Sequence, residues 1–351
     1  MVPIRNARAY YAAIPSEHIE PDVHVKYVDS RTIDLDTIEL NGGFLLKTLC
    51  LGIDPFIRSR MHGRKVDTKI RGYIPKFELD QPLIGYGVGK VVRSESDSYQ
   101  PGDVLHGWLS HEEYSVYHGP LAAFIPFRKI EHIGLPWSVY LGVLGMPGQT
   151  AYFGWKAFSK AQTGETVFVS TAAGAVGSLV VQLAKRDGLR VVASSGSADK
   201  VAYASECGAD VSFNYKNEKV WDVLAREKQG VDIYFDSVGG EHLDAAFANA
   251  NRFARFIENA MASLYNDGEP YHLEYIGLIT GKSITMQGLH HSTLYPQFEA
   301  DFYATMPQLV KDGAIKYRED VSHGLETVGQ ALNDVGTGKN SGKRVVVVAD
   351  D

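Results

Sequence analysis

Cysteine is scarce in this chain of 351 residues, which contains only Cys50 and Cys207. Two cysteines cannot build the disulfide framework that staples small secreted domains. They also cannot supply the four closely spaced thiolates of a structural zinc lobe. We therefore expect a protein of a reducing compartment, located in the cytoplasm.

The chain also lacks an excess of basic charge and any long apolar run. Its 35 Lys and Arg residues against 42 Asp and Glu residues give a formal net charge of −7, whereas nucleic-acid binding needs a clustered basic surface. No stretch approaches the roughly 20 apolar residues of a membrane helix, and the first residues contain no apolar core of a signal peptide. We expect a soluble protein with neither nucleic-acid nor membrane partners.

The sequence is long enough for two hydrophobic cores, and its patterns change along its length. Residues 1 to about 130 contain short β-like runs interrupted by Gly and Pro, and the tail from about 314 returns to this character. Between them, apolar strands alternate with helical patterns, which predicts βαβ units around a parallel sheet. We expect these helices to begin at Ala175, Ala198 and Asn217, with Gly188 and Gly208 ending the first two.

A glycine-containing loop follows the first apolar strand of this middle zone. Thr166–Ser170 has the pattern of a buried strand, and Thr171–Gly177 leads from it into a helical run. The spacing is that of the dinucleotide fingerprint, with Ala172 in place of the first glycine. Gly174 would allow the backbone to approach a pyrophosphate, and Gly177 would allow the helix to pack closely on the strand.

The residues after the next strand favour NADP over NAD. An NAD enzyme usually places an acid there, on the ribose 2′-hydroxyl, but Ser194–Ser197 contains none and Lys200 offers a cation. A 2′-phosphate would be repelled by a carboxylate and attracted by these groups. Asp199 complicates this interpretation, although in the first turn of a helix it should point away. Ser197 as a plain helix cap and Lys200 as a surface lysine are the alternatives.

A second glycine-rich segment, Gly336–Lys343, only looks like a nucleoside triphosphate loop. Its two glycines are one residue too far apart, and Arg344 stands where a magnesium-binding Ser or Thr is required. We do not expect a nucleoside triphosphatase.

Ordered landmarks along nearly the whole chain resemble one family. The chain is similar to the zinc-independent branch of the medium-chain dehydrogenase/reductase superfamily that contains prostaglandin reductases, leukotriene hydroxydehydrogenases and alkenal double-bond reductases. The matching segments are Asp54–Met61, Gly85–Val91, Gly145–Tyr152, the loop to Gly177, Phe213–Lys216, Tyr234–Gly240, Tyr265–Asn266, Met286–Gly288 and Gly338–Lys343.

The resemblance implies an α/β fold of two domains. A GroES-like, β-rich catalytic domain would comprise residues 1–130 and 315–351, and a Rossmann domain with a doubly wound parallel sheet would comprise residues 131–314. It also implies NADPH-dependent reduction of the carbon–carbon double bond of α,β-unsaturated aldehydes or ketones, and a homodimer. The alternatives are an NADPH-dependent quinone reductase and a non-catalytic NADPH-binding regulatory protein.

The resemblance further assigns roles to individual residues. Lys200 and Tyr215 would hold the 2′-phosphate, Asn340 would contact the cofactor, and Tyr265 would be the active-site tyrosine near the nicotinamide ribose. Without the family context, Tyr265 would be one packed aromatic among 19 tyrosines. The full cofactor-binding set is Pro147, Thr150, Ala173, Gly174, Val176, Gly177, Ser195, Gly196, Lys200, Tyr215, Tyr265 and Asn340, and the substrate pocket is Phe56, Tyr86 and Met146.

We expect the chemistry to need no metal. Zinc-dependent relatives carry Gly-His-Glu where this chain has Ile84-Gly85-Tyr86, and catalytic zinc needs Cys and His ligands. Hydride addition to the β-carbon places negative charge on the carbonyl oxygen, and a phenol such as that of Tyr265 can donate a hydrogen bond to it. We expect water to supply the proton for the α-carbon.

Four segments depart from the pattern of the branch. Phe56 replaces a tyrosine, His111 replaces a tryptophan, Asn259–Met261 replaces Cys-Gly-Met, and Ser237 replaces an asparagine. These changes predict a substrate different from the usual alkenals rather than a different class of chemistry.

Overall fold

The computed structural model describes residues 3–61, 76–119, 127–266 and 271–351, and these divide into two compact units. One unit runs to Leu141 and resumes at Glu319–Asp351; the other is Gly142–Arg318. The sequence placed the divisions at 130/131 and 314/315. The first division falls later because the 3-10 helix η1 (Trp137–Leu141) is bound within the first unit, where its Ser138 hydroxyl donates to Glu319 at 2.8 Å.

The first unit is built on a seven-stranded sheet in the order β16-β17-β5-β6-β7-β9, with β8 also pairing with β5. The pairs are antiparallel except for β16 and β17, which are parallel. The strands are β5 (Phe44–Ile53), β6 (Ile84–Ser94), β7 (Val104–Ser110), β8 (Tyr114–Tyr117), β9 (Arg128–Lys129), β16 (Glu319–His323) and β17 (Lys343–Val347). Both ends of the chain therefore contribute to one sheet.

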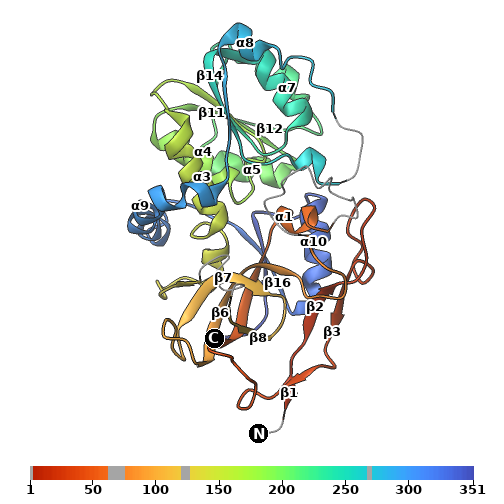
Figure 1. The fold of residues 1–351 in the computed structure, drawn as a ribbon. Helices are drawn as coiled ribbons and strands as arrows, with labels where there is room; N and C mark the ends of the chain where they lie inside the picture. The colour runs from red at the N-terminus through yellow and green to blue at the C-terminus, as the bar shows by residue number, and fades with distance from the viewer. Residues whose placement is uncertain (1–2, 62–75, 120–126, 267–270) are drawn as a thin grey trace. The chain divides into compact units, whose positions relative to one another are not determined.

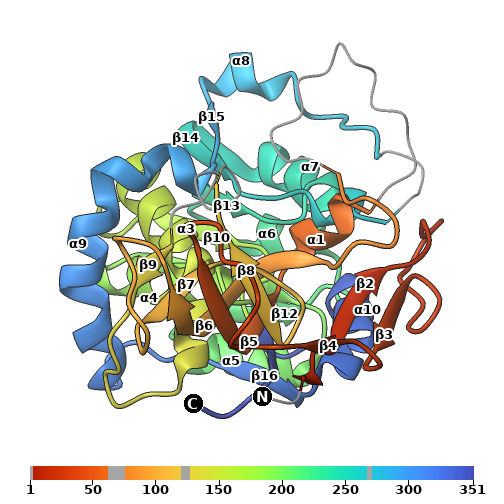
Figure 2. The ribbon, with the colours of Figure 1, turned by 60° about the horizontal axis from the view of Figure 1, so that its bottom comes forward.

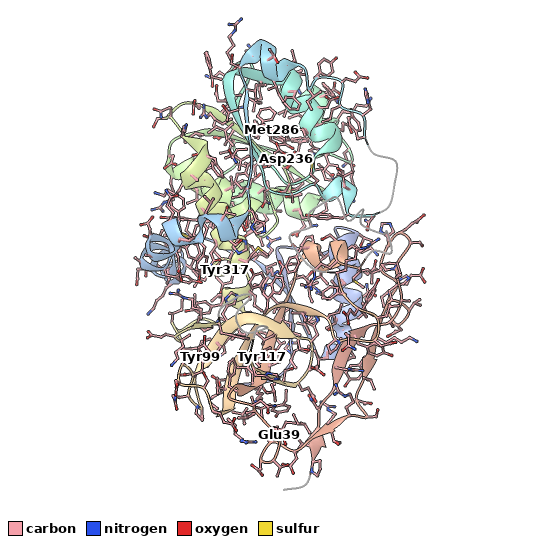
Figure 3. All side chains as sticks on the ribbon, in the orientation of Figure 1. Glu39, Tyr99, Tyr117, Asp236, Met286 and Tyr317 are labelled. Carbon is pink, nitrogen blue, oxygen red and sulfur yellow. The ribbon has the colours of Figure 1, made fainter. Side chains whose placement is uncertain are left out.

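Small elements and aromatic packing complete the first unit. Phe44 packs against Tyr99, Tyr117 and Phe127 with ring centroids 5.0 to 5.7 Å apart. Figure 3 labels both tyrosines. Figure 2 shows α10 beside β2 and β3. The remaining elements are β1 (Ile4–Arg5), β2 (Arg8–Tyr11), β3 (Val25–Val28), β4 (Thr32–Ile33), α1 (Pro55–Ser59), η4 (Leu325–Thr327) and α10 (Val328–Gly336).

The second unit contains a six-stranded parallel sheet in the order β12-β11-β10-β13-β14-β15. The central strands are buried except for the partly exposed Asp232 of β13, as expected when helices cover both faces of a parallel sheet. The strands are β10 (Thr166–Val169), β11 (Arg190–Ser195), β12 (Val211–Asn214), β13 (Val231–Asp236), β14 (Ala250–Glu258) and β15 (Thr285–Gly288).

Helices lie on both faces of this sheet, as α4 and α7 show in Figure 1. On one face, Phe168 stacks on Tyr234 and Phe256 meets Tyr234 edge to face, in a core that α6 and α7 complete. The helices are α3 (Met146–Gly154), followed directly by the π-helix η2 (Trp155–Ser159), α4 (Gly177–Arg186), α5 (Ala198–Glu206), α6 (Val220–Arg226), α7 (Gly240–Asn249), the 3-10 helix η3 (Ala262–Leu264), α8 (Leu278–Lys282) and α9 (His291–Lys311). The fold is the α/β fold with a doubly wound sheet that the sequence predicted.

Two of the expected helix starts are wrong. Helix α4 begins at Gly177 rather than Ala175, because the loop continues as a turn in which the Gly174 N–H donates to the Thr171 carbonyl. Helix α6 begins at Val220 rather than Asn217, because the Asn214 side chain accepts the Lys216 N–H and holds a turn there. The start of α5 at Ala198 is confirmed, as is the left-handed glycine after each of α4 and α5.

Candidate nucleotide-binding site

The order of strands in the second unit creates a place for a ligand. From β10 the chain passes to β11 and β12 on one side, then returns to β13 and β14 on the other. At such a switch point the loops after the two central strands diverge, and ligands bind in the crevice outside the carboxyl ends of the strands. The loops that begin at Ser170 and Ser237 stand on the two sides of this point.

The loop after β10 has the tight geometry of a phosphate-binding turn. Thr171 adopts a left-handed conformation with φ of 50°. A Cβ on Gly177 would lie 2.5 Å from the Thr171 carbonyl oxygen and 2.9 Å from the Ala172 Cα, so only glycine fits. Helix α4 starts at this glycine and runs for ten residues, and its dipole favours an anion at this end.

The residues expected to hold the 2′-phosphate lie in the segments that follow β11 and β12. A Cβ on Gly196 would lie 3.0 Å from the Tyr215 hydroxyl, so the ring of Tyr215 covers the end of β11. The other edge of that ring meets His242 at a centroid distance of 5.3 Å. Ser197 caps α5 and accepts the Lys200 N–H at 3.4 Å, which places Lys200 in the first turn. The cap role of Ser197 is confirmed.

A buried carboxylate that the sequence analysis missed orders the loop on the far side of the switch point. Asp236 ends β13 and is fully buried; Figure 3 labels it within the second unit. It accepts the Tyr234 hydroxyl at 2.6 Å and the Val238 and Gly239 N–H groups at 2.7 and 2.9 Å. The Ser170 hydroxyl lies 3.3 Å from it, which links the loops after β10 and β13. An acid that ends an apolar strand is the sequence signal for such a role.

Tyr265 lies at the end of a short segment held against that same loop. It follows the 3-10 helix η3, where the Ser263 hydroxyl donates to the Val238 carbonyl at 2.6 Å and the Ala262 N–H donates to the Ser237 carbonyl at 3.1 Å. Tyr265 itself is half-buried. The segment after β14 is therefore positioned by the loop that Asp236 orders.

Pro147 and Thr150 lie on α3 of the second unit, where the Thr150 hydroxyl donates to the Met146 carbonyl at 2.7 Å. Ala173, Gly174 and Val176 lie in the loop before α4. Asn340 lies in the first unit, and its amide donates to the Gly342 carbonyl at 2.8 Å.

Two of the expected substrate-pocket residues meet in the first unit. Phe56 and Tyr86 pack edge to face with centroids 6.2 Å apart. Trp108, which the sequence analysis did not single out, stacks on Phe56 at 5.8 Å and meets Tyr86 at 5.9 Å. Because Trp108 is the register partner of Tyr86, the alternation of β6 and β7 places both rings on one face. The third expected residue, Met146, belongs to the second unit.

Potential metal ligands are dispersed in the part of the chain that the structure describes. Within it, no group of three His, Cys, Asp or Glu side chains is arranged to hold an ion. Cys50 and Cys207 are both buried and free, and burial raises the pKa of each thiol. None of the helices in the described ranges combines the length and apolar character that crossing a bilayer requires.

The strand order, the tight glycine turn and the arrangement beyond β11 define a dinucleotide-binding unit of the kind found in oxidoreductases. Comparison with known protein families supports this class. Residues 26–124 match the family described as "N-terminal domain of oxidoreductase", and residues 175–311 match the family described as "Zinc-binding dehydrogenase".

Relatives that match most of the chain show which branch of the oxidoreductases it belongs to. The NADP(+)-dependent 2-alkenal reductase of Nicotiana tabacum is 40% identical over 94% of this chain and 93% of its own length. The (+)-pulegone reductase of Mentha piperita is 38% identical over 88% and 89%. The crystal structure of CurA from Vibrio vulnificus in complex with NADPH superposes with a TM-score of 0.85 at 28% identity, over 98% of this chain and 100% of that one. The chain belongs to the medium-chain dehydrogenase/reductase superfamily, in the branch of the alkenal double-bond reductases.

Proposed function

We propose that this protein reduces the carbon–carbon double bond of α,β-unsaturated aldehydes or ketones with NADPH. The observation that carries the proposal is the acid-free end of β11, where the ring of Tyr215 lies over Gly196. The names of the tobacco and mint relatives support the reaction, and the NADPH complex of CurA supports the cofactor.

The residues of the second unit fit this cofactor. The backbone N–H groups of Ala175 to Gly177 would hold the pyrophosphate, whereas the Gly174 N–H is used within the turn. The absence of a side chain at Gly177 keeps this turn tight against the start of α4. Lys200 and Tyr215 would hold the 2′-phosphate through a cation and a hydroxyl. When bound, NADPH supplies the hydride that adds to the β-carbon of the substrate. The cofactor of this chain is NADPH.

The protein itself has to bind and orient the substrate and to stabilise the enolate. Tyr265 would donate a hydrogen bond to the enolate oxygen, directly or through a ribose hydroxyl, and water would protonate the α-carbon. A preorganised donor of this kind is worth about 3 kcal/mol in the transition state. In the first unit, the apolar wall formed by Phe56, Tyr86 and Trp108 suits an unsaturated hydrocarbon chain or ring better than a charged substrate.

We assign the aromatic part of the substrate pocket to the unit containing both chain ends, and nucleotide binding together with Tyr265 to Gly142–Arg318. We also propose that turnover needs no metal, although one matched family takes its name from zinc. The two buried cysteines, one on β5 and one directly after α5, cannot form a four-thiolate zinc lobe. Hydrogen bonding can stabilise the enolate without a Lewis acid.

The test is a screen for NADPH oxidation over a medium-chain 2-alkenal, a cyclic enone and a benzoquinone, with product analysis by mass spectrometry. We expect saturated aldehyde and ketone products, with rates unchanged by a chelator. Turnover of the quinone alone would make the protein a quinone reductase. NADPH binding without turnover of any substrate would make it a regulatory protein, and loss of activity with the chelator would refute the metal-free proposal.

A further inference from the structure

Asp199 places a negative charge at the end of the proposed 2′-phosphate site. It is the second residue of α5, directly before Lys200, and is the one acid in the segment from Ser194 to Lys200. Its side chain is 67% exposed. A carboxylate in this turn repels a phosphate dianion, and it offsets the attraction exerted by Lys200. Discrimination in favour of NADPH therefore requires that this charge be neutralised.

Arg318 lies against Asp199. A guanidinium nitrogen of Arg318 is 2.8 Å from the Asp199 carboxylate, and another is 3.9 Å from that of Glu206 at the other end of α5. The guanidinium also covers the ring of the buried Tyr203, with its carbon 4.0 Å from the ring centroid. Stacking on an aromatic face fixes the plane of a guanidinium, so this charge is held along the helix.

The segment that carries Arg318 is itself anchored to the Rossmann helices. The Lys316 backbone and the Gln182 amide exchange two hydrogen bonds, at 2.8 and 2.9 Å. The Lys316 ammonium donates to the Glu206 carbonyl at 2.8 Å. Arg318 is thus tied to α4 and α5 through its neighbour as well as through Tyr203, and it keeps its place when Asp199 is replaced.

We infer that Arg318 is a specificity-determining residue for NADPH, because it neutralises Asp199 in the first turn of α5. The inference rests on the proposed use of NADPH by this site. With Asp199, Lys200 and Arg318 all present, the first turn of α5 faces one net positive charge; without Arg318 it faces none. Arg318 acts on the phosphate through charge, and Lys200 makes the contact.

The experiment measures the Kd values of adenosine 2′,5′-bisphosphate and AMP by calorimetry, since the two ligands differ only in the 2′-phosphate. Arg318→Met should weaken bisphosphate binding about tenfold and leave AMP unchanged, because one unit charge beside a phosphate near the protein surface is worth about that factor. Asp199→Asn should strengthen bisphosphate binding. The double variant regains one net positive charge and should return to within about twofold of the unmodified protein.

Two further variants separate charge from packing. Arg318→Lys retains the charge and should stay within about threefold of the unmodified protein. Arg190→Met removes a comparable partly exposed ion pair, with Glu227 at 2.7 Å, from the start of β11, and it should leave the ratio of the two Kd values unchanged. The effect of Arg318→Met should also shrink at high salt.

The outcomes are distinguishable. If the unmodified protein binds both ligands equally, the proposed use of NADPH fails and the inference fails with it. If the unmodified protein prefers the bisphosphate but Arg318→Met weakens both ligands equally, Arg318 is a packing residue. Failure of the double variant to recover would likewise overturn the inference, even if Arg318→Met alone behaves as expected. Should Arg318→Met not fold, Arg318→Lys and Asp199→Asn still decide the question.

Discussion

Asp236 and Glu258 are register partners at the ends of adjacent parallel strands, and their carboxyl groups share the buried edge of the sheet. Burial and the neighbouring charge of Asp236 raise the pKa of Glu258 to about 9. Burial also raises the pKa of Asp236, but the donors on Asp236 favour its ionised form. Glu258 therefore holds its proton at neutral pH, beside a carboxyl group whose hydrogen-bond donors favour its ionised form.

Replacing Glu258 by Gln should make the protein more stable toward alkaline pH. An unfolded glutamate ionises near pH 4.5, whereas Glu258 in the folded chain ionises near pH 9. The folded state therefore holds the additional proton over this window, and the free energy of unfolding falls as the pH rises through it. Glu258→Gln lacks this dependence, so its advantage should grow by up to about 1.4 kcal/mol for each pH unit within this window.

Thermal unfolding of both proteins from about pH 5 to pH 9 measures this difference. The same substitution at the exposed Glu274 of the same unit is the control and should give a curve parallel to that of the unmodified protein. Parallel curves for Glu258→Gln would mean that Glu258 is ionised in the folded protein.

Gly177→Ala should weaken nucleotide binding while the protein still folds. Its Cβ would lie 2.5 Å from the Thr171 carbonyl oxygen, so the loop must move away from the start of α4. We expect the Kd for NADPH to rise at least about tenfold, with destabilisation of about 1 to 3 kcal/mol. Fluorescence titration with NADPH checks the first effect. Gly281→Ala is the matched control, because a Cβ on this helical glycine of α8 meets no atom within 4 Å; equal affinity of the two variants would refute the role of the turn.

The sequence predicted local features best where one residue determines the geometry. Ser197 as a cap and Gly188 and Gly208 after their helices follow from side-chain hydrogen bonding and from the left-handed backbone, both of which are local. The pairing of Asp236 with Glu258 depends on the register of two strands that are separated by a whole helix. Trp108 was missed for the same reason, since only the pairing of β6 with β7 places it beside Tyr86.

Tyr265→Phe should lower kcat for an enone by about 10²-fold, with little change in the KM for NADPH. The phenol is proposed to stabilise charge that develops only as hydride is transferred, and loss of such a donor affects the transition state more than the ground state. The ring is kept, so thermal stability should be unchanged. Tyr275→Phe, an exposed tyrosine of the same unit, is the control. An unmodified rate, or an effect confined to stability, would make Tyr265 a packing residue.

Lys343→Met should destabilise the protein by about 3 to 5 kcal/mol, because it leaves the Asp54 carboxylate buried without its cation. The two side chains are 4% and 5% exposed, with Nζ 2.5 Å from the carboxylate. Lys343 thus has a structural role in the segment that resembles a triphosphate loop. Denaturation by urea, followed by tryptophan fluorescence, measures the loss.

Two further variants test whether this loss comes from the buried, uncompensated charge of Asp54. Lys343→Met combined with Asp54→Asn should recover part of the loss, because the uncompensated charge is then absent. Lys129→Met removes an exposed ion pair with Asp103 from the same unit and should cost less than about 1 kcal/mol. A loss for Lys343→Met as small as that for Lys129→Met would contradict the prediction.

The position of β17 in the sheet also sets an order of events during translation. β17 pairs with β5, yet almost three hundred residues separate them, and all of Gly142–Arg318 is made in between. Domains generally fold as units while the ribosome is still working. The nucleotide-binding unit can therefore form on the nascent chain, whereas the Cys50–Ile53 part of one edge of β5 stays open until β17 emerges, since β8 covers only Phe44–Lys47. A ribosome that stalls before Lys343 would hold a finished Rossmann unit attached to an unclosed sheet, whose exposed strand edge is a target for chaperones.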